Sequence, residues 1–312
     1  GTASVEFEYL TGFSTYFQPP HTVAYQLYVD EGMPSLAALA GSQGYETTAF
    51  HPYKSSGWNR PVAYRDLDFD KQMYEEDVTD PQYIRHYISD ACDFQTIFQT
   101  TQQQVKSFFF NVTMQNHSGY AQGWNNLERT ISLPDSLKLA DSNAEQYFAL
   151  ARQTDNALRE LIGYYSRCDE PTMIVFFGDH QPNLPEDFYN TLLESQRGDL
   201  SDAELRQKKM VTPFFIWANY DIEEQANVQI SANYLSAYAL NALGCSTSGF
   251  DQMRLALQQQ IPVMNVNGYR LPDGTWYPQS EQPENDLLND YHNAEYAQIF
   301  DAKNRSDEWY TP

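Results

Sequence analysis

The sequence predicts an α/β domain with a mainly parallel sheet flanked by helices. Short apolar runs alternate along the chain with longer stretches of helical periodicity, which is the pattern of repeated βαβ units. The chain has 312 residues, which is long enough for one large α/β domain. Hydrophobic residues make up 41% of the sequence and aromatic residues 15%, so the chain can bury a sizeable core.

Two helix and strand pairs are expected in the first half of the chain. A short helix is predicted over residues 33–43, where Gly44 supplies the C-terminal stop, and a strand follows at 47–50. A second helix is predicted over residues 88–104, followed by a buried strand over 107–114.

The second half begins with the longest helical pattern, over residues 141–165, which has apolar residues at helical spacing and no internal proline. The elements expected after it are a strand at 173–177, a polar segment at 184–209, a strand at 212–217, and helices at 232–243 and 251–260. Residues 261–312 are rich in Asn, Asp, Pro, Gly and Tyr and carry turn signals. We therefore expect a main domain over residues 1–260 and a C-terminal tail, 261–312, packed on its surface.

The composition excludes several classes of partner. A net charge of -23 argues against nucleic acid and against a polybasic membrane patch, since both attractions need clustered Lys and Arg. The apolar runs at 172–177 and 213–217 are far shorter than the roughly 20 residues that span a bilayer, and no signal peptide is recognisable. The three cysteines are widely separated and suggest neither a zinc site nor a disulfide framework.

Three histidines come directly after predicted strands, and this placement is the main functional signal. They are His51, His117 and His180, the last preceded by Asp179. In an open parallel sheet the carboxyl ends of the strands line the ligand crevice, so these side chains are expected to converge.

Asp179 and His180 form the best metal candidate, because a carboxylate and an imidazole at one strand end suit a divalent ion. The alternative is an ordinary strand-end turn, where Gly-Asp is common. His51 and His117 fit contacts to a phosphate or a leaving group, since imidazole can donate to an anionic oxygen and transfer a proton near neutral pH. The alternative for each is a satisfied polar residue.

A loop after His51 carries Trp58 and Arg60. The planar guanidinium of arginine matches phosphate or sulfate oxygens, and a tryptophan can form an apolar wall beside it. A surface ion pair is the alternative for Arg60. Thr2 gives no local signal, because a residue next to the start of a sequence usually belongs to a disordered terminus.

Six motifs occur in a fixed order. They are Gly1-Thr2-Ala3, the segment 5–12, His51-Pro52-Tyr53, Trp58-Asn59-Arg60, the segment 113–117 and Gly178-Asp179-His180. In this order they resemble the lipoteichoic acid synthase family, within the sulfatase and alkaline-phosphatase-like superfamily. The resemblance spans residues 1–180, and residues 213–217 are also similar to the family.

The resemblance implies a reaction and a role for each residue. Thr2 would be the nucleophile and a metal ligand, with Asp179, His180 and an upstream Glu completing the site for one Mn²⁺ or Mg²⁺ ion. The residues around the phosphoglycerol group would be His51, Trp58, Arg60 and His117. The family takes phosphoglycerol from phosphatidylglycerol through a covalent threonine intermediate, releases diacylglycerol, and passes the group to a glycerol, glycolipid or glycan hydroxyl.

The family's Glu ligand lies on a strand before the nucleophile. The resemblance therefore implies a domain that is N-terminally truncated here, without its upstream strands and membrane helices, from a protein on the extracellular face of the cell membrane. We expect the fragment alone to bind metal weakly and to be inactive. Strand edges without their neighbours would also favour self-association.

Three alternatives remain. A conventional sulfatase shares the fold and the Asp-His ligands, but its C/S-x-P-x-R motif is absent from this sequence. A phosphoethanolamine transferase would also use a Thr nucleophile, although Trp58-Asn59-Arg60 and the Glu-Phe-Glu segment favour the phosphoglycerol branch. The alternative from another class is a non-catalytic extracellular binding module that keeps the fold.

Overall fold

A computed structural model of the protein describes residues 1–19, 22–102, 104, 106–198, 200–281, 283–301, 303 and 305–312. Its helices are α1 (Thr2–Thr11), α2 (Ala24–Leu27), α3 (Leu36–Ser42), α4 (Arg60–Asp66), α5 (Asp90–Thr101), α6 (Asp135–Ala140), α7 (Ala144–Tyr165), α8 (Glu186–Arg197), α9 (Asp202–Lys208), α10 (Ala232–Ala242), α11 (Gly249–Gln260) and α12 (Asp286–Phe300). The short 3₁₀ helices are η1 (Thr15–Phe17), η2 (Glu75–Asp77) and η3 (Asp307–Tyr310).

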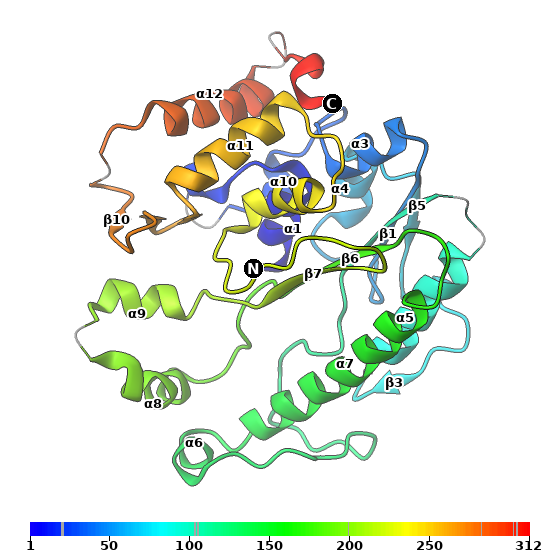
Figure 1. Ribbon diagram of the computed structural model, residues 1–312. Coiled ribbons are helices and arrows are strands. Elements are labelled where there is room, and N and C mark those ends of the chain that lie inside the picture. Colours follow the sequence, from blue (N-terminus) through cyan, green and yellow to red (C-terminus); the bar gives the residue numbers. More distant parts are fainter. Residues whose placement is uncertain are drawn as a thin grey trace.

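The strands fall into four groups. They are β1 (Glu46–Phe50), β2 (Lys71–Met73), β3 (Tyr83–Ile84), β4 (Tyr87–Ile88), β5 (Ser107–Asn111), β6 (Met173–Phe177), β7 (Phe214–Ala218), β8 (Val263–Asn265), β9 (Gly268–Arg270) and β10 (Trp276–Pro278). The order β2-β1-β5 forms a parallel sheet, in which Phe50 lies opposite Met73 and Asn111. The predicted α/β class with a parallel sheet flanked by helices is therefore confirmed (Figure 1).

The remaining strands pair antiparallel. Strand β6 pairs with β7 in the register Met173 to Ala218, after a connection that contains α8 and α9. Strands β3 and β4 form a hairpin with a two-residue turn, and β8, β9 and β10 form a small sheet in the C-terminal part. The expected sheet is thus parallel around β1 but not at β6 and β7.

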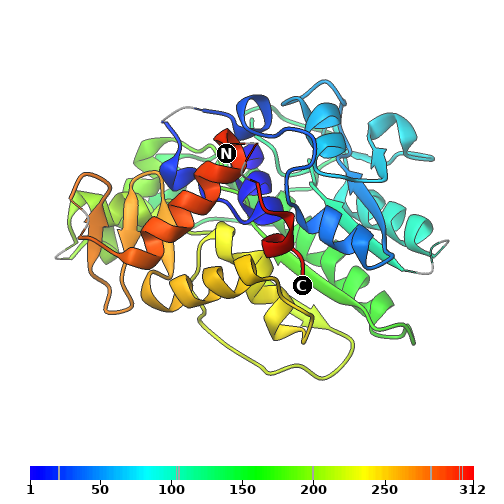
Figure 2. The same cartoon turned by 90° about the horizontal axis from the view of Figure 1, so that it is seen from above.

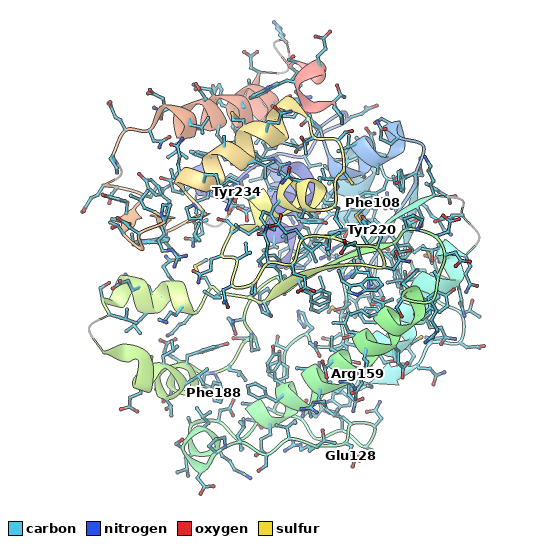
Figure 3. All side chains as sticks on the ribbon, viewed as in Figure 1. Phe108, Glu128, Arg159, Phe188, Tyr220 and Tyr234 are labelled. Atoms are coloured by element: carbon cyan, nitrogen blue, oxygen red, sulfur yellow. The ribbon has the colours of Figure 1, made fainter. Side chains whose placement is uncertain are left out.

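A gap separates β5 from β6. Among the described strands, β5 pairs only with β1 and β6 only with β7. The ring of Tyr9 on α1 contacts both strands, with its centroid 6.0 Å from Phe110 and 4.6 Å from Phe177. A cavity of about 2830 Å³ is lined by residues of both strands, and the apolar side chains of β6 and β7 are mostly half-buried rather than buried. Phe108 of β5, which is labelled in Figure 3, lines this cavity.

Helix α1 lies in the main hydrophobic core. Its residues Phe7 and Leu10 are almost fully buried, and α10 packs directly against it. Seen from above, the helices α10 to α12, yellow to red, lie over the blue α1 (Figure 2). The helix ends at Gly12, whose φ of 74° is accessible to glycine without strain and lets its N–H donate to the carbonyl of Glu8 at 2.9 Å.

Residues 261–312 form three strands, α12 and η3, and they contribute to the main core. Tyr291 of α12 is fully buried, and its hydroxyl donates to the carbonyl of Gly12 at 2.6 Å. Glu295 accepts a hydrogen bond from the backbone N–H of Ser14 at 2.9 Å. The segment expected as a surface tail therefore holds the end of α1 in place.

Most predicted elements are present with shifted ends. Helix α3 is shorter than predicted, α5 begins two residues later at Asp90, and β5 ends at Asn111 instead of residue 114. Serine caps fix two of these starts, because the hydroxyls of Ser35 and Ser89 accept from the N–H groups of Ala38 and Cys92. The polar segment 184–209 contains α8 and α9, which were not predicted. In the described part of the chain, no helix has the length and apolar character needed to cross a bilayer.

Candidate active site

Helix α1 presents Thr2 at its N-terminus. Gly1 caps the helix, so the backbone N–H groups of the first turn point out of its end and create a partly positive site. The hydroxyl of Thr2 donates to Oδ2 of Asp179 at 2.5 Å, across 177 residues of sequence. A hydroxyl beside a carboxylate at a helix N-terminus is well placed to attack an anionic phosphate.

Asp179 and His180 follow β6 directly. Nε2 of His180 lies 3.3 Å from Oδ2 of Asp179, the same oxygen that accepts from Thr2, while Nδ1 lies 2.8 Å from the carbonyl of Gln181. Oδ2 of Asp179 therefore contacts both the hydroxyl of Thr2 and the imidazole of His180. A Cβ added to Gly178 would lie 3.0 Å from the side chain of Thr212, so strand packing, rather than a ligand, explains this glycine.

Arg60 begins α4 and is buried. Its Nη2 donates to Oε1 of Glu6 at 2.5 Å, and the hydroxyl of Tyr64 donates to Oε2 of the same carboxylate at 2.6 Å. Burial opposes the charge on Arg60, but the neighbouring Glu6 outweighs it and the pKa of Arg60 is raised. Arg60 therefore forms a buried ion pair, not the surface pair that was the alternative, and its Nε is buried without a partner among the described residues.

Trp58 lies on the loop before α4 and is 54% exposed. Its φ is 58° and that of Asn59 is 60°, so two consecutive non-glycine residues have left-handed backbone. The amide of Asn59 donates to the carbonyl of Tyr25 at 3.1 Å and holds this strained turn. The loop thus presents an indole ring to solvent at the cavity.

His51 follows β1 and is buried. Its Nδ1 lies 2.8 Å from the carbonyl of Val112, so this nitrogen carries the proton and donates. Burial, helped by the nearby charge of Arg60, lowers the pKa of His51 to about 4. At neutral pH the ring is uncharged and Nε2 is left as an acceptor, which suits a hydroxyl of the substrate better than a phosphate oxygen.

His117 lies six residues beyond the end of β5, because the strand is shorter than predicted. Its Nδ1 is 3.0 Å from the carbonyl of Ser118 and 3.3 Å from the hydroxyl of Tyr87. Arg85 holds the backbone on both sides through Nη2, which donates to the carbonyls of Gln115 and His117 at 2.7 and 2.6 Å. His117 is exposed, but its loop is fixed.

All seven predicted site residues line the same cavity of about 2830 Å³. The seven are Thr2, His51, Trp58, Arg60, His117, Asp179 and His180. Direct hydrogen bonds join Thr2 to Asp179, whereas Arg60 is bonded to Glu6 and His117 to its own loop. The structure therefore places the seven around one cavity, and the role of each stays a prediction.

The donor set fits a divalent ion only in part. Oxygen and imidazole donors from Thr2, Asp179 and His180 suit Mn²⁺ or Mg²⁺. Within the described residues, no group of three or more His, Cys, Asp or Glu side chains could hold a metal ion. A further carboxylate is needed to complete a set of this kind, as the resemblance to the family implies.

A sequence model of the sulfatase family, described as "Sulfatase", matches residues 1–245. The chain belongs to the sulfatase family. The match includes every predicted site residue and leaves the C-terminal part outside it. Sulfatase-superfamily members usually use a divalent metal ion, and the predicted resemblance to lipoteichoic acid synthases within this superfamily is confirmed.

This sulfatase-family chain is 28% identical over 324 residues to a Rhizobium meliloti protein named for cyclic beta-1,2-glucan modification, covering 99% of this chain and 49% of that protein. It thus spans about half the length of this relative. The solved phosphoglycerol transferase GacH of Streptococcus pyogenes, in complex with sn-glycerol-1-phosphate, has a TM-score of 0.73 at 20% identity, covering 95% of this chain and 72% of GacH. The lipoteichoic acid synthase LtaP of Listeria monocytogenes has a TM-score of 0.65 at 21% identity, covering 96% of this chain and 78% of LtaP. Both likenesses show that the chain shares this fold.

Three structural partners of the site were not predicted. Glu6 pairs with Arg60, Arg85 supports the His117 loop, and Tyr87 contacts the His117 ring. Glu6 stands four residues after Thr2, so a helix beginning at Thr2 would have placed both on one face. Arg85 lies in a two-residue stretch between the short β-prone pairs 83–84 and 87–88, which is the local signal of a hairpin.

Proposed function

We propose that the protein transfers phosphoglycerol from phosphatidylglycerol to a glycerol or glycan hydroxyl, with Thr2 as the nucleophile. The observation that carries this proposal is the 2.5 Å hydrogen bond from Thr2 to Asp179 at the N-terminus of α1. The relatives support it by their names, which refer to phosphoglycerol transfer, lipoteichoic acid synthesis and glucan modification. The proposed location is the extracellular face of the cell membrane.

The proposed reaction has two displacement steps at phosphorus. Oγ1 of Thr2 gives up its proton to solvent as it attacks the phosphorus of phosphatidylglycerol, while the bond to the diacylglycerol oxygen breaks. His117 supplies the proton that this oxygen needs to leave as a hydroxyl. In the second step the acceptor hydroxyl attacks the phosphothreonine, loses its proton to the same histidine, and Oγ1 of Thr2 leaves and regains a proton.

Charge around the phosphate is offset by groups that are already in place. The N-terminus of α1 and the side chain of Arg60 line the same cavity as Thr2, where they would offset the charge of a bound phosphate. The unpartnered Nε of Arg60 is a donor that a ligand oxygen can satisfy directly or through water. His51 accepts from a glycerol hydroxyl through Nε2, and Trp58 forms an apolar wall beside the head group.

The metal proposal uses Thr2, Asp179 and His180 as ligands for Mn²⁺ or Mg²⁺. Such an ion, when bound, supplies Lewis-acid stabilisation of the phosphate and lowers the pKa of the threonine hydroxyl. The proposal also includes an upstream segment of the natural protein that provides a Glu ligand and a strand. Among the described strands, β5 and β6 each have one unpaired edge, and both strands line the cavity, which is consistent with an added strand at this position. Calorimetric titration of the present chain with Mn²⁺ tests this point, because tight stoichiometric binding would show that no upstream ligand is needed.

The test of the function uses the full-length protein with a fluorescent phosphatidylglycerol. We expect diacylglycerol release that requires Mn²⁺ or Mg²⁺, stops with EDTA, and falls by at least about 10³-fold in Thr2→Ala. Thr191→Ala is the control, because this threonine lies on α8, is not among the residues that line the cavity, and donates its hydroxyl to the carbonyl of Asp187 in the same helix. Unchanged turnover in Thr2→Ala would reject the assigned nucleophile, and equal losses in both variants would indicate a folding defect.

A further inference from the structure

Four aromatic rings form a continuous strip beside the active site. The ring centroids of Tyr53 and Tyr87 are 5.7 Å apart, those of Tyr87 and His86 are 3.9 Å apart, and those of His86 and Trp124 are 5.0 Å apart. The strip starts at the site, since the ring of Tyr87 lies 5.8 Å from that of His117. It leads from His117 out of the cavity, because Tyr53 and Tyr87 line the cavity whereas His86 and Trp124 do not.

Core packing accounts for Tyr87, which is buried, but not for Tyr53, His86 and Trp124. None of its four residues belongs to any of the four hydrophobic clusters formed by the described residues. His86 is exposed, and both Tyr53 and Trp124 are half-buried. Tyr87 is buried and contacts the rings of Tyr53 and His86. Aromatic side chains that lie together at a site and outside the core favour ligand binding.

The outer part of the strip is held rigidly. Arg85 and His86 form the two-residue turn between β3 and β4, and Arg85 has a φ of 59°. The amide oxygen of Asn126 accepts from the N–H of Arg85 at 3.1 Å, and its nitrogen donates to the carbonyl of Arg85 at 3.0 Å. Since Asn126 lies two residues from Trp124, these bonds fix the two loops that carry the His86 and Trp124 rings.

The inner part of the strip is tied to the same hairpin. The guanidinium of Arg85 lies over the ring of Tyr87, 5.3 Å from its centroid, and bonds the carbonyls of His117 and Gly119. Burial, together with the neighbouring Arg85 and His117, lowers the pKa of His86, so its ring is neutral at pH 7. A fixed and uncharged aromatic surface loses little conformational entropy when it binds a ligand.

We propose that the aromatic strip binds the sugar rings of a glycan acceptor and delivers one of its hydroxyls to the site at His117. One face of a pyranose ring carries C–H groups that pack on the electron-rich face of an aromatic ring, while the sugar hydroxyls remain in water. A polyanionic polymer is disfavoured by the net charge of -23. This inference rests on the proposed function and assigns its acceptor to a carbohydrate, the class to which the name of the Rhizobium meliloti relative points.

Two measurements on the full-length protein test the strip, with cyclic beta-1,2-glucan as the probe. Calorimetry measures glucan binding without any donor. A turnover assay measures two reactions: diacylglycerol release when water is the acceptor, and phosphoglycerol transfer when glucan is added. In Trp124→Ala we expect the affinity for glucan to fall about tenfold and the KM for glucan to rise by about the same factor. Diacylglycerol release in water should be unchanged. Trp124→Phe keeps a ring and is expected to retain most of the affinity.

Tyr296→Ala is the matched control, because this ring on α12 is 57% exposed and remote from the strip in sequence. His86→Ala is the second variant if Trp124→Ala fails to fold. The proposal is overturned if the wild type does not bind the glucan, or if Trp124→Ala and Tyr296→Ala bind it equally well. Strip-dependent glucan binding in a wild type that releases no diacylglycerol would support the strip and reject the transferase function separately.

Discussion

Replacing Glu6 by Ala is expected to destabilise the protein strongly, because this carboxylate is shared by two buried donors. Arg60 donates to one oxygen at 2.5 Å and Tyr64 to the other at 2.6 Å. The exposed fractions of the Arg60 and Glu6 side chains are 3% and 4%, so water cannot replace the lost acceptor. The substitution leaves one buried charge and one buried hydroxyl without a partner.

The size of the effect follows from these two losses. Breaking a buried ion pair by removing one partner costs about 3–5 kcal/mol, and an orphaned buried hydroxyl adds about 1–3 kcal/mol. The two terms overlap, because one rearrangement can relieve both, so about 4 kcal/mol is expected. Arg60→Met in the Glu6→Ala background removes the uncompensated charge and is expected to recover part of this loss.

Urea unfolding followed by circular dichroism measures these differences. The control is Asp155→Ala, which removes the ion pair between Asp155 and Arg159 on the surface of α7, where Figure 3 shows Arg159. That pair has an N to O distance of 3.2 Å and side chains that are 58% and 72% exposed, so its loss should cost under about 1 kcal/mol. The reasoning is refuted if Glu6→Ala and Asp155→Ala cost the same, or if the added Arg60→Met destabilises further.

Two further predictions concern pH. Burial lowers the pKa of His51 from 6.5 to about 4, so the folded state favours the neutral ring. The resulting contribution to the free energy of unfolding, about 3 kcal/mol, is present above pH 6.5 and is lost as the pH falls through 4. Unfolding curves at several pH values should show this loss in the wild type and not in His51→Gln; parallel losses would contradict it. Burial raises the pKa of Glu295 from 4.5 to about 8, so the folded state favours the protonated carboxyl. Its contribution to the free energy of unfolding, about 5 kcal/mol, is present below pH 4.5 and is lost as the pH rises through 8. Glu295→Gln should remove that decline, and an unaltered decline would assign it to other groups.

The placement of the site could be predicted from the sequence because strand ends are local features. His51 and Asp179 follow apolar runs that did become strands, and parallel strands β1 and β5 bring their carboxyl ends together. His117 also lines the cavity, although its strand ends early. The pairing direction of β6 and β7 could not be predicted, because no local pattern tells whether a strand after a long connection returns parallel or antiparallel.

Helix α1 was missed for a physical reason. Residues 5–9 alternate apolar and acidic side chains, which is the pattern of a strand. In the helix that forms instead, Glu6 and Glu8 are both buried. Donors to both carboxylates lie outside this helix: Arg60 and Tyr64 donate to Glu6, and Ser14 and Thr15 donate to Glu8. Such compensation depends on the tertiary fold and cannot be read from the segment itself.

The same compensation links the stability of the protein to its chemistry. Thr2 and Glu6 are one helical turn apart, so the ion pair of Glu6 with Arg60 sets the position of the helix N-terminus relative to α4. The other end of α1 is held by Tyr291 through the carbonyl of Gly12. A change at either end that lets the helix shift by an ångström would weaken the contact of Thr2 with Asp179. Tyr291 is not among the residues that line the cavity, so variants such as Tyr291→Phe should lower the rate of diacylglycerol release before they unfold the protein.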